Sequence, residues 1–274
     1  MSLPLDHVVI AVLDLETAIA DYTALGFQVL RGGDHPGRPT HNALVVFADG
    51  SYLELIAWKS PAPQERWWPL LQRHGEGIVD FALLPQDTAE TVAGAARRGL
   101  VLEGPLAGGR LRPDGERLQW RTARPSSADL PFLCGDITPR ALRVPEGAAR
   151  VHPNGAVGVA RLDIAVHDLD ASLARYRALF GEAASAAQIG AAVTEPGSGL
   201  RHARISVGSS TLVLSSATDS GAASPNAIAR RFPSRGEGPS ALVLRRADTA
   251  RAGQVLDIAR THGAPIRFES DEGL

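Results

Sequence analysis

The chain has 274 residues, of which 44% are hydrophobic and 21% are charged, values typical of a folded globular protein and not of a disordered one. The formal net charge of −2 excludes the basic surface that nucleic acids and anionic lipids require. A single cysteine, Cys134, excludes a disulfide framework and a cysteine-based zinc site. Residues 1–7 lack signal-peptide features, and no apolar run approaches the roughly 20 residues that cross a bilayer. We therefore expect a cytoplasmic protein without nucleic-acid or membrane partners.

Two stretches of sequence, 12–25 and 166–179, repeat each other at an offset of 154 residues. Seven of the fourteen positions are identical, and each stretch follows a short apolar segment typical of a strand. Each helix would begin at an aspartate suited to an N-cap, Asp14 or Asp168. The repeat predicts a strand, a tight turn and an amphipathic helix followed by glycine.

Two weaker copies of this pattern follow in the chain. Asp87 opens a predicted helix that ends near Gly99, and Asp248 opens one that ends near Gly263. After the first three helices, apolar segments predict further strands at 41–48, 51–57, 118–123, 130–134, 202–207 and 210–215. Four βαβββ units result, and the last is predicted to be incomplete because the chain leaves room for only one more strand.

The segment 137–156 contains Pro and Gly and little periodicity, which indicates a linker between a first domain at 1–136 and a second at 157–274. The glycines of 104–109 lack the strand and helix of a nucleotide site, and we predict a loop there. The sequence contains no P-loop, no Gly-x-Ser-x-Gly elbow and no His-Glu-x-x-His motif. Nucleophilic hydrolase classes are therefore excluded.

This organisation resembles the vicinal oxygen chelate superfamily, and within it the glyoxalase-like group with the fold of glyoxalase, bleomycin resistance proteins and extradiol dioxygenases. The match is specific over about residues 1–135 and rests on segments 5–7, 32–44, 49–56 and 130–132. The resemblance implies an α+β fold in which tandem βαβββ units form two cupped half-barrel domains, the second degenerate. It also implies a divalent metal in the cup, with Zn, Fe, Mn, Ni and Mg as candidates.

Two polar side chains interrupt apolar strands of the first unit. His7 shares a strand face with Val9 and Ala11, and Glu54 is the one charge of the strand at 51–57. A buried carboxylate needs a cation or donors beside it, and a metal would satisfy both side chains, as would hydrogen bonds or an arginine. These are also the positions at which the resembling family places metal ligands.

The second unit departs from the family pattern. Alignment on the helix caps puts Asp80 opposite His7, and it puts Cys134 near the position opposite Glu54. We predict a metal site of His7, Glu54 and Asp80, a set that suits hard or borderline metals. Cys134 is interpreted as a small apolar filler or an additional ligand.

Further candidates surround the predicted cup. The segment 32–42 is predicted to be a loop over the cup that contacts a ligand, although a plain turn-rich connection explains it as well. Tryptophans near the first inter-unit loop could wall a small-molecule pocket or cover the core. The predicted ligand-binding residues are His35, His41, Asn42, Trp58, Trp67, Trp68, Phe132 and Cys134.

Two functions from different classes fit these residues. The first is a metal-dependent lyase, isomerase or related enzyme that acts on a small molecule with neighbouring oxygens, with Glu54 as catalytic base. Ring-cleaving oxygenase chemistry is disfavoured because His7 has no histidine at the matched position of the second unit. The second is a non-catalytic protein that sequesters a small molecule, and a scaffold or homodimer with a vestigial cup is a third interpretation.

Overall fold

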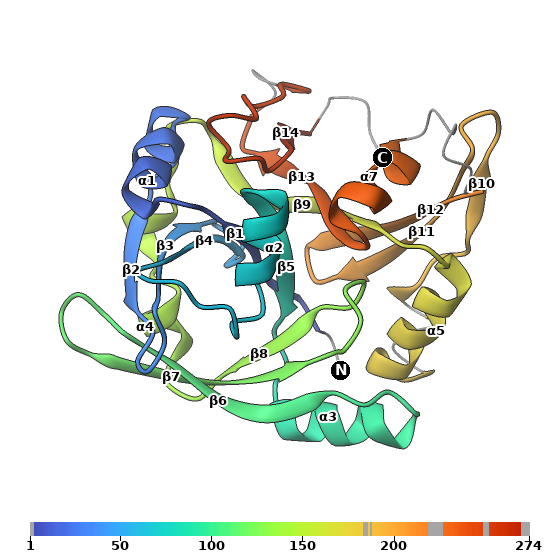
Figure 1. The fold of residues 1–274 in the computed structure, drawn as a ribbon, viewed down its shortest axis with the longest axis horizontal. Helices are drawn as coiled ribbons and strands as arrows, with labels where there is room; N and C mark the ends of the chain where they lie inside the picture. Colours follow the sequence, from blue (N-terminus) through green and yellow to red (C-terminus); the bar gives the residue numbers. More distant parts are fainter. Residues whose placement is uncertain (1–2, 183–185, 187, 219–226, 249–251, 270–274) are drawn as a thin grey trace.

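A computed structural model describes residues 3–182, 186, 188–218, 227–248 and 252–269. These residues form two mixed sheets with helices around them (Figure 1). The helices are α1 (Leu15–Ala24), α2 (Trp68–His74), α3 (Thr88–Arg97), α4 (Arg140–Arg143), the 3-10 turn η1 (Gly147–Arg150), α5 (Leu169–Phe180) and α7 (Ala227–Arg235). The strands are β1 (Leu5–Ala11), β2 (Leu30–Asp34), β3 (Thr40–Val46), β4 (Tyr52–Trp58), β5 (Gly77–Leu83), β6 (Glu103–Leu111), β7 (Arg117–Arg124), β8 (Phe132–Asp136), β9 (Ala156–Ala165), β10 (Val193–Glu195), β11 (Leu200–Val207), β12 (Ser210–Ala217), β13 (Gly238–Arg246) and β14 (Ile266–Phe268).

The first sheet closes on itself in the order β1-β4-β3-β2-β6-β7-β8-β5. One βαβββ unit supplies β1 to β4 and the next supplies β5 to β8, so each unit is half of a barrel-like cup. Antiparallel pairing of β1 with β5 closes one side, and a single pair, Asp34 with Leu111, joins β2 to β6 on the other. The predicted α+β fold of repeated βαβββ units is confirmed.

The second sheet has the order β10-β11-β12-β9-β13-β14. The third unit supplies β9 to β12, while β13 and the three-residue β14 are what the described residues contain of the fourth. The helix predicted between Asp248 and Gly263 is wrong for the described residues 252–263, which form turns. Asp257 accepts a hydrogen bond from the backbone of Ala259 and Gly253 has a φ of 71°, so local bonding and a left-handed residue replace the helical ladder.

Three helices of the repeat begin and end as the sequence predicts. Each is capped by an aspartate carboxylate that accepts a hydrogen bond from a backbone amide of the first turn: Asp14, Asp87 and Asp168. Each is followed by a glycine with positive φ, at 85°, 86° and 83° respectively: Gly26, Gly99 and Gly181. The same local chemistry therefore sets the turn out of each helix.

The pleat of β1 divides its side chains between two environments. Val8 and Ile10 belong to the large core in which the outer face of the barrel packs on residues of the second sheet, including Leu162 and Leu212. Val9 and Ala11 belong to a smaller apolar cluster with residues of β8, and His7 lines the cavity inside the cup. The strand therefore turns His7 toward the interior.

Three segments that the sequence left without regular structure take part in the fold. The predicted loop at 104–109 is wrong because it lies within β6, where Gly108 leaves room for the indole of Trp120 on β7. The predicted loop at 32–42 belongs largely to the β2–β3 hairpin. The predicted linker contains α4 and η1, and its His152 lies with Nε2 3.0 Å from the carbonyl oxygen of Val46.

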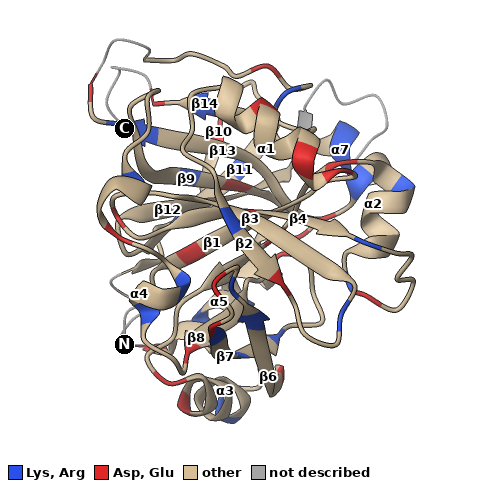
Figure 2. Ribbon diagram, turned by 90° about the vertical axis from the view of Figure 1, so that its left-hand side faces the viewer, with Lys and Arg blue, Asp and Glu red and all other residues tan. Residues whose placement is uncertain are grey.

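Charged residues of both signs are spread over the elements of the fold (Figure 2). This distribution agrees with the nearly equal numbers of basic and acidic residues in the sequence. Among the described residues, no helix combines the length and apolar character needed to span a membrane.

Candidate active site

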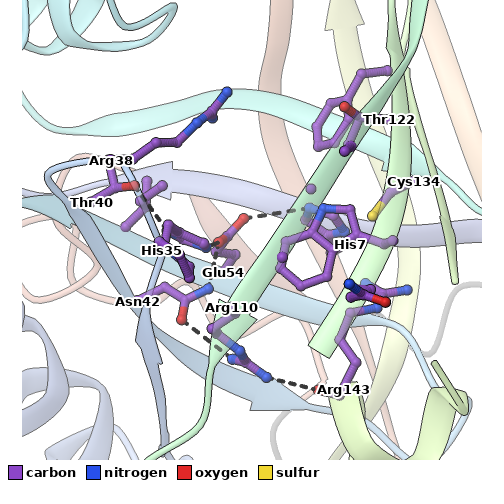
Figure 3. Close-up of a pocket in the computed structure, with 18 of the residues that line it drawn as sticks. His7, His35, Arg38, Thr40, Asn42, Glu54, Arg110, Thr122, Cys134 and Arg143 are labelled. Atoms are coloured by element: carbon purple, nitrogen blue, oxygen red, sulfur yellow. Dashed lines mark hydrogen bonds and ion pairs between the residues drawn. The ribbon is translucent and has the colours of Figure 1, made fainter. Parts of the chain in front are cut away.

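The first sheet encloses a cavity of about 240 Å³. Side chains from β1, β3, β4, β6, β7 and β8 line it, together with residues of the β2–β3 connection. Four polar side chains meet in its middle, as Figure 3 shows: His7, His35, Asn42 and Glu54. The predicted cup therefore exists and holds several of the predicted residues.

His7 is held from both ring nitrogens and on both ring faces. Its Nδ1 lies 2.7 Å from Oδ2 of Asp6, and its Nε2 lies 3.5 Å from Oε2 of Glu54. The ring stacks on Tyr52 at a centroid distance of 4.6 Å and meets the edge of Phe132 at 5.3 Å. The imidazole is thus fixed in position, with Nε2 facing the middle of the cavity.

The charge state of His7 follows from these neighbours. Burial alone would lower the pKa of the imidazole, but the hydrogen bond to Asp6 and the contact with Glu54 raise it above its usual value of 6.5. Burial raises the pKa of Asp6, but Arg143, His7 and Arg140 together outweigh this effect and hold the pKa well below its usual range, so Asp6 stays ionised. Asp6 and Glu54 therefore both favour the imidazolium form of His7.

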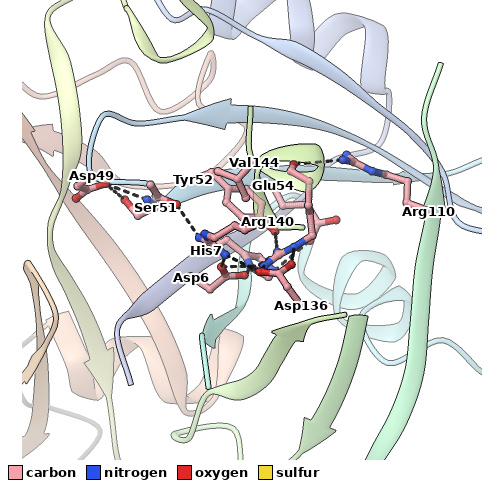
Figure 4. Close-up of polar contacts among 12 residues, drawn as sticks. Asp6, His7, Asp49, Ser51, Tyr52, Glu54, Arg110, Asp136, Arg140 and Val144 are labelled. Carbon is pink, nitrogen blue, oxygen red and sulfur yellow. Dashed lines mark hydrogen bonds and ion pairs between the residues drawn. The ribbon is translucent and has the colours of Figure 1, made fainter. Parts of the chain in front are cut away.

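Asp6 is fully buried and lies in a network of arginines (Figure 4). Arg143 donates to it at 2.8 and 3.1 Å, and Arg140 donates at 2.6 Å. Arg143 also donates to Asp136 at 3.0 Å and to the hydroxyl of Tyr52 at 2.7 Å. Both arginines come from α4, so the segment predicted as a linker supplies the support of the site.

The carboxylate of Glu54 lies between two imidazoles. Its Oε2 faces His7, while its Oε1 lies 3.9 Å from Nε2 of His35 and accepts a hydrogen bond from Asn42 at 2.6 Å. Burial raises the pKa of this carboxyl, but the close contact and charge of His7, together with His35 and Asn42, outweigh burial and lower the pKa to about 2. Glu54 is therefore ionised throughout the physiological range.

His35 has the opposite electrostatic setting. Its Nδ1 lies 2.9 Å from Oγ1 of Thr40, and its ring meets the edge of Trp120. Burial lowers its pKa below 6.5, and the nearby Glu54 only partly opposes this effect. Burial therefore favours the neutral form of His35, whereas the carboxylates beside His7 favour its charged form.

Asp80 has its own set of partners. Its Oδ2 accepts from Nε1 of Trp67 at 2.9 Å and lies 3.1 Å from Arg66, and its Oδ1 accepts from the backbone of Phe81 at 2.9 Å. It pairs across the strands with Val9 and not with His7. Both oxygens of Asp80 are therefore engaged by groups other than His7 and Glu54.

The donor set was tested for its fit to a divalent metal. The two imidazoles approach opposite oxygens of Glu54, and the amide of Asn42 already occupies one of those oxygens. Within the described part of the chain, no three or more His, Cys, Asp or Glu side chains are grouped closely enough to hold a metal ion. The predicted set of His7, Glu54 and Asp80 is therefore not brought together as a metal site.

Comparison with known proteins decides the family. The family model for the glyoxalase-like domain matches residues 5–180. The chain belongs to this glyoxalase-like family. Its membership confirms the predicted place in the vicinal oxygen chelate superfamily. A search of curated proteins gives no match.

Solved structures share the fold of this glyoxalase-like chain at low identity. A hypothetical protein from Staphylococcus aureus has a TM-score of 0.70 at 12% identity, with 98% of this chain and 99% of that one covered. A mutant of 4-hydroxymandelate synthase from Streptomyces coelicolor has a TM-score of 0.63 at 17% identity and 90% and 72% coverage. A xylose isomerase-like TIM barrel/4-hydroxyphenylpyruvate dioxygenase fusion protein has a TM-score of 0.55 at 17% identity and 95% and 38% coverage. These similarities establish the fold alone.

The glyoxalase-like cavity takes in only some of the predicted ligand-binding residues. Among the side chains that line it are His35, Asn42, Trp67, Phe132 and Cys134. His41 is not among them because it alternates with Thr40 and Asn42 along β3, and its nearest charges include Lys59. Trp58 and Trp68 meet edge to face at 5.7 Å and do not line the cavity. Burial raises the pKa of the Cys134 thiol, which is therefore inert.

Two arginines of the site were missed by the sequence reasoning. Arg143 lies in the segment predicted to be a linker, and Arg110 directly follows the glycine-rich segment 104–109, which was predicted to be a loop. Arg140 and Arg143 are spaced to share one helix face, which was an available signal. Arg110 carried no such signal, because its burial depends on the pairing of β6 in the barrel.

Proposed function

We propose that this protein is an isomerase or lyase that moves a proton at a carbon next to a carbonyl group of a small oxygenated molecule. The observation that supports the proposal is the placement of two imidazoles, His7 and His35, on opposite oxygens of Glu54 inside one cavity. Neighbouring groups with divergent proton affinities are the arrangement that acid–base catalysis requires.

In the proposed reaction, His7 stabilises the oxygen of the substrate. Its Nδ1 is bound to Asp6, and its Nε2 lies at 3.5 Å from Glu54, a distance longer than a normal hydrogen bond. A carbonyl oxygen that enters the cavity can accept a hydrogen bond from this Nε2–H. The interaction strengthens as negative charge develops on that oxygen, because the donor is cationic and fixed.

His35 is the proton acceptor in this scheme. When Nδ1 carries the ring proton and donates it to Thr40, Nε2 keeps its lone pair within the cavity. The substrate C–H bond breaks, its proton passes to Nε2 of His35, and its electron pair moves to the carbonyl oxygen held by His7. Return of the proton to a different atom or face completes an isomerisation, and departure of a neighbouring group completes an elimination.

Glu54 positions the two imidazoles in this scheme. A carboxyl whose pKa is about 2 is a weak base, so the sequence-based role of Glu54 as catalytic base is less suitable than His35. Its negative charge instead favours the cationic form of His7. No step of the scheme passes through a metal.

The test is exchange of carbon-bound hydrogen with D₂O, followed by ¹H NMR, over a panel of small 2-hydroxy and 2-oxo aldehydes, ketones and acids. We expect the wild type to exchange one class of these compounds, with or without EDTA. His7→Gln and His35→Gln should each lower the rate by roughly 10²-fold or more, because each removes a proton-transfer group. Exchange that is unchanged in both variants, or abolished by EDTA, would contradict the scheme.

Sequestration of a ligand is the second candidate, favoured by the aromatic side chains at the cavity wall. The ring centroids of Trp67 and Phe132 lie 5.9 Å apart, and Trp120, on the neighbouring strand β7, packs against the same apolar cluster. Such walls hold a flat molecule without requiring chemistry. Ligand binding in the absence of any exchange over the whole panel would select this function.

A further inference from the structure

Arg110 is a buried cation without an anionic partner. Its side chain lines the cavity, only 3% of the residue is exposed, and no carboxylate among the described residues forms an ion pair with it. Its hydrogen bonds to the amide oxygen of Asn42 and the carbonyl oxygen of Arg143 are long, at 3.3 and 3.4 Å. Its Nε has no hydrogen-bond partner in the part of the chain that the structure describes. The guanidinium is therefore poorly satisfied by the protein (Figure 3).

This situation is energetically unfavourable for the protein alone. A guanidinium remains charged in proteins, and a buried charge is normally paired with a carboxylate or fully hydrogen-bonded. The other buried arginine of the cavity, Arg143, follows that rule through Asp6 and Asp136. Arg110 contacts Arg143 but has no such carboxylate partner among the described residues. This difference indicates that the partner of Arg110 is an anion from outside the chain.

The remaining charges of the cavity wall do not supply that anion. The carboxylates that line it are Glu54, which faces His7, and Glu65, which lies 3.6 Å from Arg38. Further guanidinium groups line the same wall: Arg38, Arg117, Arg124 and Arg143. Cations outnumber anions in the cavity, so its field favours an anionic ligand.

We propose that Arg110 binds the carboxylate of a small carboxylic acid, which is the ligand of this cavity. The inference deepens the proposed function, because it concerns the same site and names the class of molecule. A single planar guanidinium matches a carboxylate through two parallel N–H···O bonds, whereas a phosphate dianion would call for more than one unpaired buried cation.

The other residues of the cavity determine the size and shape of the remainder of this acid. Asn42 connects Arg110 to Glu54 through two hydrogen bonds, so the carboxylate lies close to the two imidazoles. Trp67, Trp120 and Phe132 provide flat apolar walls in the same cavity. A volume of about 240 Å³ accommodates a small molecule only. The expected ligand is a compact acid with a flat apolar body.

Binding of matched acids and amides tests the proposal. Calorimetric titration would use benzoate, phenylacetate and cinnamate, the primary amide of each, and phenylphosphonate. We expect the wild type to bind at least one acid more tightly than its amide and than phenylphosphonate. Arg110→Met should weaken that acid by roughly 10- to 100-fold, the effect of losing a charge-assisted pair, and leave the amide unchanged.

Control variants make the outcome specific. Arg121→Met replaces an exposed arginine of the neighbouring strand β7 that does not line the cavity, and it should bind the acid like the wild type. If Arg110→Met fails to fold, judged by circular dichroism, Arg110→Lys takes its place and should lose part of the preference. No acid binding by the wild type, equal binding of acid and amide, preference for the phosphonate, or full binding by the Arg110 variant would each overturn the proposal.

One further arm separates this inference from the proposed function. His35→Gln removes the proton acceptor but not the guanidinium, so it should keep the preference for acid over amide. If the wild type prefers acid over amide but shows no proton exchange on any compound of the panel, the carboxylate site stands and the enzyme is refuted. Proton exchange on uncharged carbonyl compounds, undiminished in Arg110→Met, would refute the carboxylate site and leave the enzyme standing.

Discussion

Nε2 of His7 and Oε2 of Glu54 face each other at 3.5 Å across two parallel strands. The register of β1 and β4 places His7 opposite Tyr52 and Val9 opposite Glu54, so the two polar groups are diagonal neighbours on the inner face of the barrel. Burial of both groups makes their interaction strong and sensitive to pH. The predictions below follow from this pair and from the residues that hold it.

Acid stability should depend on Glu54. Its pKa is about 2 in the folded protein and near 4.5 in an unfolded chain, so its contribution is present above pH 4.5 and is lost as the pH falls toward 2. The wild type should lose about 3 kcal/mol over that interval from this group, and Glu54→Gln should show a flatter pH dependence. Urea unfolding at several pH values measures the free energy of unfolding.

The matched control is Glu195→Gln, which changes a carboxylate at an exposed strand edge. A Glu54→Gln profile parallel to that of the wild type would refute the prediction.

The two cavity histidines should titrate on opposite sides of pH 6.5. The pKa of His7 is raised by Asp6 and Glu54 despite burial, whereas that of His35 is lowered by burial. The favourable contribution of His7 to stability is therefore complete below pH 6.5 and is lost as the pH rises through its folded pKa. NMR titration of ¹⁵N-labelled imidazoles, assigned with His7→Gln and His35→Gln, measures both. Glu54→Gln should lower the pKa of His7, and a pKa of His35 above that of His7 would contradict the assignment.

Arg143 should be important for stability. Replacement by Met leaves Asp6 without its main counter-charge and removes the donors to Asp136 and Tyr52. Breaking one side of a buried ion pair costs about 3–5 kcal/mol. Equilibrium unfolding in urea should show a loss in this range, whereas the exposed Arg121→Met should change stability by less than about 0.5 kcal/mol. A loss below about 1 kcal/mol for Arg143→Met would mean that the network is not held as described.

Gly32 should control the shape of the site although it bears no side chain. A Cβ at this position of β2 would overlap the amide oxygen of Asn42 and the guanidinium of Arg110. Gly32→Ala should therefore displace both groups and reduce acid binding by roughly tenfold or more, the loss expected from one charged hydrogen bond. Calorimetric titration measures the affinity. Gly190→Ala, where the space is ordinary, should bind as the wild type does, and unchanged affinity in Gly32→Ala would contradict the described packing.

The repeat could be predicted from the sequence because its signals are local. The caps Asp14, Asp87 and Asp168 and the glycines after their helices act within a few residues, so they appear as spacing in the chain. The alternation that turns His7 into the cup is equally local, since it follows from the pleat of one strand. The same local reasoning missed β6, whose glycines read as a loop until β7 lies beside them.

What the sequence by itself determined is thus the βαβββ repeat and the alternation of its strands that sets His7 and Glu54 apart from their apolar neighbours. Only the tertiary structure decided how these side chains are partnered. The register of the strands places the carboxylate of Glu54 between the imidazoles of His7 and His35. Asp80 instead contacts Arg66 and Trp67, so it does not join the predicted metal ligands. The barrel buries Arg110 of β6, and no described carboxylate forms an ion pair with it. Charge pairing depends on distances between segments far apart in the chain, and neither periodicity nor spacing encodes those distances.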